Sequence, residues 1–355
     1  TLQSVLNVRM TESVWDDAVL PVSRGGLVIR AASHAALPAF LSSVTSAESL
    51  TVQLLPPRPH PTIGINDPLF EQAVTEWQLR SNAALPNLPQ RAIQKAWDSP
   101  LLDVLSARVS PAAQTQAGFA RLTAAAAPFA GAFLEAIPCS AVGTRMDNSS
   151  FRIAAALRLG AEICSPHNCI CGAPVDSSGV HGLSCRKSSG RQIRHSAVNG
   201  IIKRALASAE VPARLEPSSL SRDDGKRPDG MSLMPWKEGR CLIWDFTCAD
   251  TLAQSHLDRA VLRAATVADD AEQRKRQKYV SLSATYYFVP ICIETLGPMG
   301  EEAAAFFADV GQRIATATGE PRSKTFLMQR LSIAVQQGNA ACVLGTVPVS
   351  TDLYI

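Results

Sequence analysis

The stretch RPDGMSLMPWKEGRCLIWDFTC, residues 227–248, contains two β-favouring segments around a short polar one. Its second half, CLIWDFTC, is an apolar run of the kind that forms a buried strand. Between the halves, Lys237–Gly239 has the composition of a hairpin tip. We therefore predict a β-hairpin in which Asp229, at the start of the first strand, converges with Asp245, near the end of the second.

Asp229 and Asp245 are the residues that indicate catalysis. Two carboxylates in one cleft repel each other unless a divalent cation lies between them. Nucleases hold Mg²⁺ in this way, and the ion activates water and neutralises the phosphate. Asp245 stands in an apolar run, where a carboxylate is costly without a partner or a metal. We predict that both acids bind Mg²⁺ or Mn²⁺. The alternative is structural, with an Asp that caps a turn or pairs with Arg227 or Arg240.

Upstream, residues 163–185 read ICSPHNCICGAPVDSSGVHGLSC and concentrate cysteine and histidine in a short loop. Four soft or borderline ligands at such spacings are typical of a closed structural zinc site. A loop this small has little hydrophobic core of its own and needs a cross-link, such as a bound metal, to be stable. The predicted ligands are Cys169, Cys171, His181 and Cys185, and Cys164 or His167 could replace one of the C-x-C pair. The alternative is a set of buried thiols with an incidental histidine.

A basic segment, RQIRHSAVNGIIKRAL, follows the loop at residues 191–206. Its apolar positions predict a helix with one buried stripe, formed by Ile193, Val198, Ile201, Ile202 and Leu206. The cations on and before this helix suit contacts with nucleic-acid phosphates. They are Arg186, Lys187, Arg191, Arg194, His195, Lys203 and Arg204. The alternative is a helix face that is merely solvated.

The rest of the chain predicts an α+β protein. Helical periodicity dominates residues 1–160, interrupted by the proline-rich connector LPPRPHP at residues 55–61. After the hairpin we expect a charged helix and the strand TYYFVPICIET, and then two further helices. These are an Ala-rich helix over Glu301–Thr318 and an amphipathic helix over Lys324–Gln337. The tail from Gly338 is expected to be extended.

Composition excludes several classes of protein. The 355 residues carry a formal net charge of +3, so any nucleic-acid surface must be a local concentration of cations. Nine cysteines, clustered rather than spread, favour a reducing compartment and a metal over a secreted disulfide framework. The N-terminus does not resemble a signal peptide, and no apolar run is long enough to span a bilayer. Without an initiator Met, the chain is expected to be part of a longer polypeptide.

The order of these motifs resembles a known family. Pro-Asp, a hairpin, Asp-x-Thr and a Lys-bearing helix resemble the PD-(D/E)xK restriction-like endonucleases. The preceding zinc knuckle and Arg-His, with Lys-Tyr after them, look like the C-terminal part of site-specific non-LTR retrotransposon proteins, and LPVSRGGLVIR at residues 20–30 looks like the segment after their polymerase. This resemblance implies a Mg²⁺- or Mn²⁺-dependent nuclease that nicks DNA to prime reverse transcription. It also implies a template RNA, an upstream reverse transcriptase in the same polyprotein, a nuclear location and no membrane.

The resemblance also implies domain boundaries. These are a post-polymerase region at 1–157, a zinc knuckle at 158–190, a restriction-like α/β domain with a central mixed sheet flanked by helices at 191–300, and C-terminal helices at 301–355. A catalytically decayed nuclease that only binds nucleic acid is the competing interpretation.

Carried over residue by residue, the resemblance makes Asp229 and Asp245 the two metal-binding acids. Thr247 occupies the position where restriction-like enzymes often have lysine. The lysine would then come from the following helix, as Lys275 or Lys278. The alternative for the basic residues of that helix is a solvated face that attracts DNA.

Glu216, in the segment RLEP, is a further candidate at the start of the same domain. It would serve as another metal or water ligand. The alternative is a salt bridge with Arg214.

Overall fold

The computed structural model describes residues 2–54, 64–112, 115–220 and 227–347. The predicted connector at 55–61, the polar loop around Asp223 and Asp224, and the last eight residues of the predicted extended tail lie outside these ranges. The helices are α1 (Leu2–Leu6), α2 (Glu12–Val19), α3 (Ala32–Leu54), α4 (Pro68–Ser81), α5 (Gln94–Ala112), α6 (Gln116–Ala125), α7 (Ala132–Glu135), α8 (Asn148–Leu159), α9 (His181–Ser184), α10 (Gly190–Ser208), α11 (Leu257–Ala260), α12 (Thr266–Lys278), α13 (Glu301–Thr318) and α14 (Ser323–Leu344). The strands are β1 (His167–Asn168), β2 (Pro174–Val175), β3 (Ala213–Leu215), β4 (Gly230–Lys237), β5 (Arg240–Ala249) and β6 (Tyr287–Glu294). The predicted α+β class is confirmed.

The central sheet is mixed and has the order β3-β4-β5-β6. The predicted hairpin is confirmed, because β4 and β5 pair antiparallel around Glu238 and Gly239, which both have positive φ. β5 and β6 pair in parallel over their full overlap, from Leu242↔Tyr287 to Ala249↔Glu294. A parallel pair needs a crossover, and α11 and α12 supply it. The short edge strand β3 was not predicted from the sequence.

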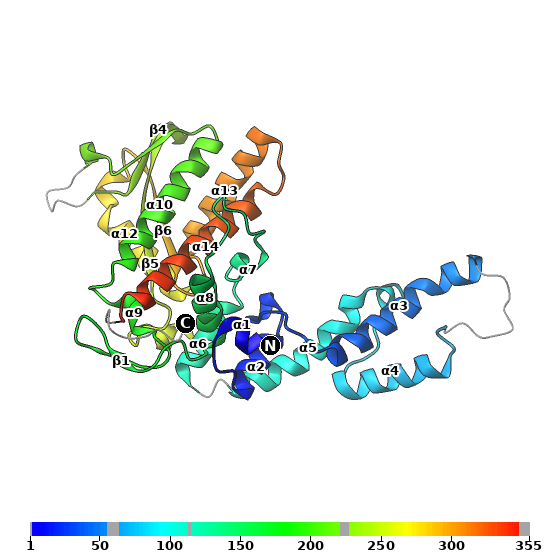
Figure 1. Cartoon of the computed structure of the whole chain (residues 1–355). Coiled ribbons are helices and arrows are strands. Elements are labelled where there is room, and N and C mark those ends of the chain that lie inside the picture. The colour runs from blue at the N-terminus through cyan, green and yellow to red at the C-terminus, as the bar shows by residue number, and fades with distance from the viewer. Residues whose placement is uncertain (1, 55–63, 113–114, 221–226, 348–355) are drawn as a thin grey trace.

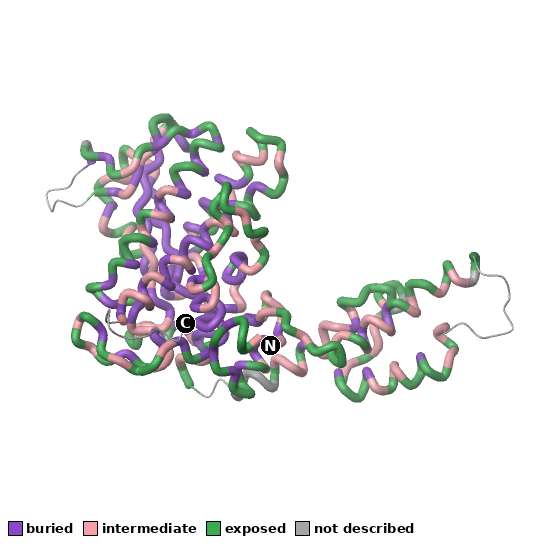
Figure 2. Tube along the Cα trace, in the orientation of Figure 1, coloured by how far each residue is buried: buried purple, intermediate pink, exposed green. Residues whose placement is uncertain are grey.

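Helices cover both faces of this sheet. Leu242, Trp244 and Phe246 point to one face, where they pack with α10, α13 and α14 in the main core. The alternate residue Ile243 packs on the opposite face with Tyr279, which directly follows α12. Figure 1 shows the helical layer of α10, α13 and α14 on one side of the sheet, and Figure 2 shows the buried residues concentrated there. Asp245 shares the α12 face with Ile243, since strand side chains alternate.

The C-terminal helix α14 corrects two predictions. It extends seven residues past the predicted end at Gln337, so Gly338 lies inside a helix and not in an extended tail. It is also buried on most sides instead of amphipathic, because it packs against α8, α9, α10 and α13. Its residues complete the core of the sheet domain, so the predicted boundary at residue 300 does not separate two cores. A Cβ on Gly338 would lie 2.4 Å from the Cβ of Arg194, which shows how closely α10 approaches α14.

The predicted helical character of residues 1–160 is confirmed, but the region is not one unit. α3, α4 and α5 form an arm that projects from the body (Figure 1). The arm has its own small core, in which Trp77 and Trp97 meet edge to face at 5.0 Å. In contrast, α1 and α2 pack onto α8 and contribute to a core shared with α14. No helix among the described residues is long and apolar enough to cross a membrane.

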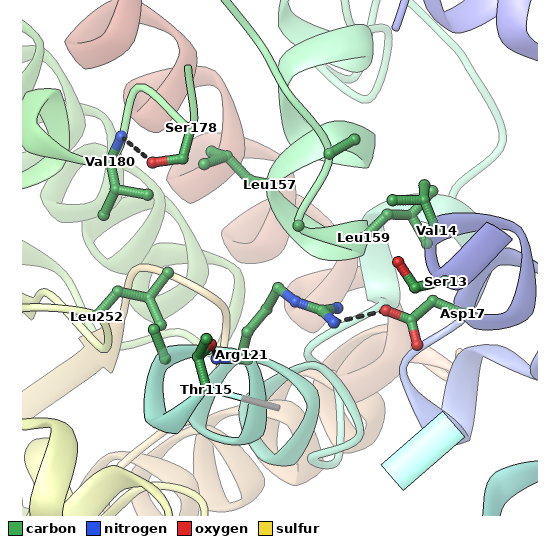
Figure 3. Close-up of a pocket in the computed structure, with 14 residues that line it drawn as sticks. Ser13, Val14, Asp17, Thr115, Arg121, Leu157, Leu159, Ser178, Val180 and Leu252 are labelled. Atoms are coloured by element: carbon green, nitrogen blue, oxygen red, sulfur yellow. Dashed lines mark hydrogen bonds and ion pairs between the residues drawn. The ribbon is translucent and has the colours of Figure 1, made fainter. Parts of the chain in front are cut away.

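Buried arginines tie the N-terminal segment to the body. Arg121 of α6 forms an ion pair with Asp17 of α2 at 2.5 Å (Figure 3). It also donates to the carbonyl oxygen of Arg158. Arg158 in turn donates to the carbonyls of Gly26 and Val22, and burial lowers its pKa to about 10. A cavity of about 350 Å³ lies beside the ion pair, between α2, α6, α8 and the knuckle. Neither predicted metal-binding acid of the hairpin lines it, so it is separate from the acidic site.

The close approach of α10 and α14 generates a stability prediction. Gly338→Ala is expected to lower the free energy of unfolding by about 1–3 kcal/mol, because the added methyl group overpacks the contact with Arg194. Gly200→Ala on α10 is the matched control, since its Cβ would meet nothing closer than an Arg204 side-chain nitrogen at 3.4 Å. Helix propensity should make that variant more stable by roughly 0.5–1 kcal/mol. Urea unfolding of both variants measures the difference, and equal stabilities would contradict the packing.

Candidate metal centre and acidic site

The predicted zinc ligands come together in the knuckle. One ligand atom from each of Cys169, Cys171, His181 and Cys185 lies within 4.8 Å of all the others. The Cys169 and Cys185 sulfurs are 3.7 Å apart, and the Cys171 sulfur is 3.3 Å from His181 Nε2. Zinc bonds of about 2.0–2.3 Å in a tetrahedron would place ligand atoms roughly 3.5–3.8 Å apart. The cluster therefore could bind a structural zinc ion.

Local structure explains why these four side chains meet. β1 and β2 form a small hairpin that carries Cys169 and Cys171 at its turn, where Gly172 has φ of 93°. His181 and Cys185 stand one helical turn apart, and the Cys185 N–H donates to the His181 carbonyl. The N–H of Ala173 donates to the Cys171 sulfur and lowers the pKa of that thiol to about 6, which favours the thiolate that zinc requires.

The two alternative ligands have other partners. The Cys164 sulfur hydrogen-bonds to the carbonyl oxygen of Asp176 at 3.4 Å. His167 bonds through Nδ1 to the Ser165 carbonyl and through Nε2 to the Thr346 hydroxyl just beyond α14. His167 therefore attaches the knuckle to the C-terminal end of α14, and neither residue belongs to the described four-residue cluster.

The two predicted acids also come together. Gly230 pairs with Trp244 across β4 and β5, so Asp229 stands beside Asp245. The Asp229 N–H donates to the Trp244 carbonyl at 2.9 Å, and Asp229 Oδ2 accepts from the Phe246 N–H at 2.6 Å. Asp229 is thus bonded to both residues that flank Asp245. The register of the β4–β5 pairing shifts twice between Met231 and Lys237, and these irregularities bring the two carboxylates to one end of the sheet.

Asp245 is buried and engaged by two lysines of α12. Its side chain is 7% exposed, with Lys275 Nζ 2.5 Å from Oδ1 and Lys278 Nζ 3.4 Å from Oδ2. Burial by itself raises the pKa of Asp245, but the charges and hydrogen bonds of Lys275, Tyr279 and Lys278 together hold that pKa below its usual range. The alternative that Asp245 pairs with Arg227 or Arg240 is wrong. The solvated-face interpretation of this helix is also wrong for Lys275 and Lys278.

A buried carboxylate fixes the helix that carries these lysines. Glu272 of α12 is 2% exposed and accepts hydrogen bonds from the N–H groups of Cys292, Glu302 and Ala303. It thereby joins α12 to β6 and to the first turn of α13, where a helix N-terminus favours negative charge. Burial nevertheless raises the pKa of Glu272 to about 7. On the same helix, Arg276 forms an ion pair with Glu302, so its charge is already balanced within the protein.

His195 belongs to the acidic site, which the sequence did not indicate. Trp244 Nε1 donates to Asn199 Oδ1 at 2.9 Å and so orients the Asn199 amide. The Asn199 NH₂ then faces His195 Nδ1 at 3.3 Å, which leaves the imidazole proton on Nε2. Nε2 lies 3.1 Å from Asp229 Oδ2. This chain of donors holds Asp229 from the α10 side, and the Asp229 bond raises the pKa of His195.

Glu216 and Thr247 occupy less central positions. The Glu216 N–H donates to the Asp229 carbonyl at 2.8 Å, whereas its exposed carboxylate pairs with Arg227. Thr247 follows Asp245 by two positions and therefore shares its strand face. β5 contains no lysine. The lysines that contact Asp245 come from α12 instead.

Most of the predicted cations of the basic segment are exposed. Arg186, Lys187, Arg191, Lys203 and Arg204 lie on the surface. Arg186, Arg191 and His195 line a cavity of about 310 Å³ with Thr247. Arg194 lines the same cavity but is not exposed as expected, because it is 2% exposed and donates to Asn339 Oδ1 of α14 at 2.5 Å. The predicted apolar stripe is confirmed except for Ile193, which is 55% exposed.

The cluster of Cys169, Cys171, His181 and Cys185 generates a prediction about metal content. Cys185→Ser is expected to lose the bound zinc and to lower the unfolding temperature, because the knuckle has almost no core besides its ligands. Cys164→Ser is the matched control and should keep one zinc per chain, since its sulfur bonds to backbone carbonyls. Elemental analysis of the purified proteins measures the ratio. Loss of zinc in both variants, or in neither, would refute the ligand set.

The His195 contacts generate a prediction about titration. Asp229→Asn should lower the pKa of His195, whereas Asn199→Ala should not lower it, because Asn199 donates to Nδ1 and opposes protonation. NMR titration of the imidazole measures both shifts. Because the folded pKa is raised, the stability contributed by this bond is fully present below about pH 6.5 and is lost as pH rises through the folded pKa. An unchanged pKa in Asp229→Asn would show that the bond does not form.

Comparison with known proteins gives no assignment for this chain. No family model matches it. No curated protein matches it either. The role of the acidic site is therefore inferred from its own residues and geometry.

Proposed function

We propose that this chain is a metal-dependent DNA endonuclease module of the restriction-like type, of the kind found in non-LTR retrotransposon proteins. One observation carries the proposal: Asp229, directly before β4, lies beside Asp245 of β5, while Lys275 and Lys278 reach Asp245 from a separate helix. A buried carboxylate with adjacent ammonium groups and a second acid beside it is costly to build. It suits a site that positions a phosphodiester and water.

The donor set fits a divalent cation. Asp229 Oδ1 accepts no hydrogen bond from any described residue, while Oδ2 is held by Phe246 and His195. Mg²⁺ or Mn²⁺ would be held by Asp229 and Asp245, and it would supply Lewis-acid activation of water and neutralise phosphate charge. The ammonium groups of Lys275 and Lys278 balance Asp245 and can donate to phosphate oxygens. His195 and Asn199 keep the Asp229 carboxylate in place.

Several features support DNA as the substrate. The cavity lined by Arg186, Arg191 and His195 adjoins Phe246 and Thr247, which directly follow Asp245. Arginine recognises phosphate oxygens through paired donors, so this cavity suits the backbone next to the cleaved bond. The resemblance of the motif order to retrotransposon nucleases adds nicking of a target to prime reverse transcription. It also adds a template RNA, an upstream polymerase in the same polypeptide and a nuclear location to the proposal.

Two observations favour a second candidate function. Both carboxylate oxygens of Asp245 are engaged by lysines, and Thr247 stands where many related nucleases have a lysine. A protein of this type that had lost its nuclease activity would still have the candidate zinc-binding cluster and the basic surface of α10. The alternative is therefore a zinc-dependent module that binds nucleic acid without cutting it.

A nicking assay on supercoiled DNA with Mg²⁺ or Mn²⁺ distinguishes the two functions. Asp229→Asn, Asp245→Asn and Lys275→Met should each reduce nicking by about 100-fold or more, the scale of losing one preorganised contact to the transition state. Glu320→Gln is the control, because Glu320 is paired with Arg322 outside the site. Its nicking rate should equal that of the wild type.

The remaining outcomes decide against the proposal in different ways. A wild type that binds DNA with strong salt dependence but never nicks it would support the binding module. Nicking that survives both aspartate substitutions would place the active site elsewhere.

A further inference from the structure

A second basic cavity lies on a different side of α10. It has a volume of about 210 Å³ and lies between α10, α14 and the loop before α8. Its polar lining comes from Ser196, Arg204, Arg330 and Gln337. Arg330 was not among the cations singled out in the sequence, because it lies in a helix that looked unrelated to the basic segment.

The electrostatics of this cavity are unbalanced. Among the described residues, none that lines it is acidic, and neither Arg204 nor Arg330 forms an ion pair. Arg330 is half-buried, and burial together with the nearby Arg204 lowers its pKa. Two guanidinium groups that face one space repel each other, and the repulsion is strengthened where solvent is partly excluded. An anion bound between the two guanidinium groups would be attracted to both and would offset their mutual repulsion.

The backbone leaves room for such an anion. Gly143 and Gly200 line the cavity, and a Cβ on Gly200 would lie 3.4 Å from Arg204 Nη1, so the guanidinium folds back over the glycine. Guanidinium groups bind the paired oxygens of phosphate in a fork geometry. The Ser196 hydroxyl and the Gln337 amide add neutral donors of the kind that accompany arginine in phosphate sites.

The cavity cannot serve the phosphate at the acid pair. Arg204 and His195 lie nine residues apart on α10. That spacing corresponds to about 13 Å along the axis and about half a turn around it. The two residues therefore face opposite sides of the helix.

We propose that Arg204 and Arg330 form a phosphate-binding site that holds a second tract of nucleic-acid backbone, separate from the strand at the acid pair. Binding of phosphate follows from the cavity alone, whereas its identity as nucleic acid rests on the proposed function. The two parts of the proposal are therefore tested separately.

The first experiment uses inorganic phosphate and the intact chain. Phosphate should raise the unfolding temperature of the wild type but not that of Arg204→Gln, Arg330→Gln or the double variant. Without phosphate, Arg330→Gln should be at least as stable as the wild type, because the substitution relieves repulsion. Lys203→Gln is the matched control, since it removes an exposed neighbouring cation that does not line the cavity, and it should retain the phosphate effect.

The second experiment measures oligonucleotide binding over a series of salt concentrations. If both arginines hold one phosphate, either single variant and the double variant should reduce the salt slope by the same amount, about 0.7–0.9. Lys203→Gln should change the slope independently of them. Neither readout requires nicking, so failure of the nuclease proposal leaves both results interpretable.

Two outcomes would overturn the inference. Equal stabilisation of the wild type and the double variant by phosphate would exclude this cavity as the phosphate site. Phosphate stabilisation that is lost in the variants, with unchanged oligonucleotide binding, would show that the site takes a free phosphate and not a nucleic acid.

Discussion

The buried carboxylate of Asp245 is the constraint on which the acidic site depends. A charged group on a central strand is stable only if partners replace the water that it loses. Lys275 and Lys278 supply that compensation, and both come from α12. The position of α12 depends in turn on Glu272, which bonds to β6 and to the start of α13. Two buried carboxylates, Asp245 and Glu272, thus link the hairpin, the crossover helix and the C-terminal layer.

The other side of the site depends on α10. Its His195 and Asn199 connect Asp229 to the indole of Trp244, while Arg194 reaches across to Asn339 of α14. The same helix therefore orients one acid and anchors the C-terminal helix. It also carries cations toward two cavities on different sides. A helix with this arrangement can contact two stretches of a polyanion while its apolar stripe remains in the core.

Local patterns in the sequence were sufficient for the knuckle, the hairpin and the pair of acids. Chelate spacing brings Cys169, Cys171, His181 and Cys185 together because short loops have few other ways to close. The Glu-Gly turn closes the hairpin, and two register shifts between Met231 and Lys237 complete the alignment that places Asp229 beside Asp245. In each case the residues that meet are separated by few positions along the chain.

The contacts that could not be predicted from the sequence join residues that lie far apart along the chain. Four features depend on how α13 and α14 pack against the sheet. They are the burial of Arg194, the length and burial of α14, the attachment of Glu272 to α13, and the position of Arg204 and Arg330 at one cavity. Helical periodicity identifies an apolar face but not the helix that covers it. The sequence therefore determined the local elements and the candidate ligands. Only the tertiary structure decided which charges are buried and which remain available, because burial depends on neighbours contributed by distant segments.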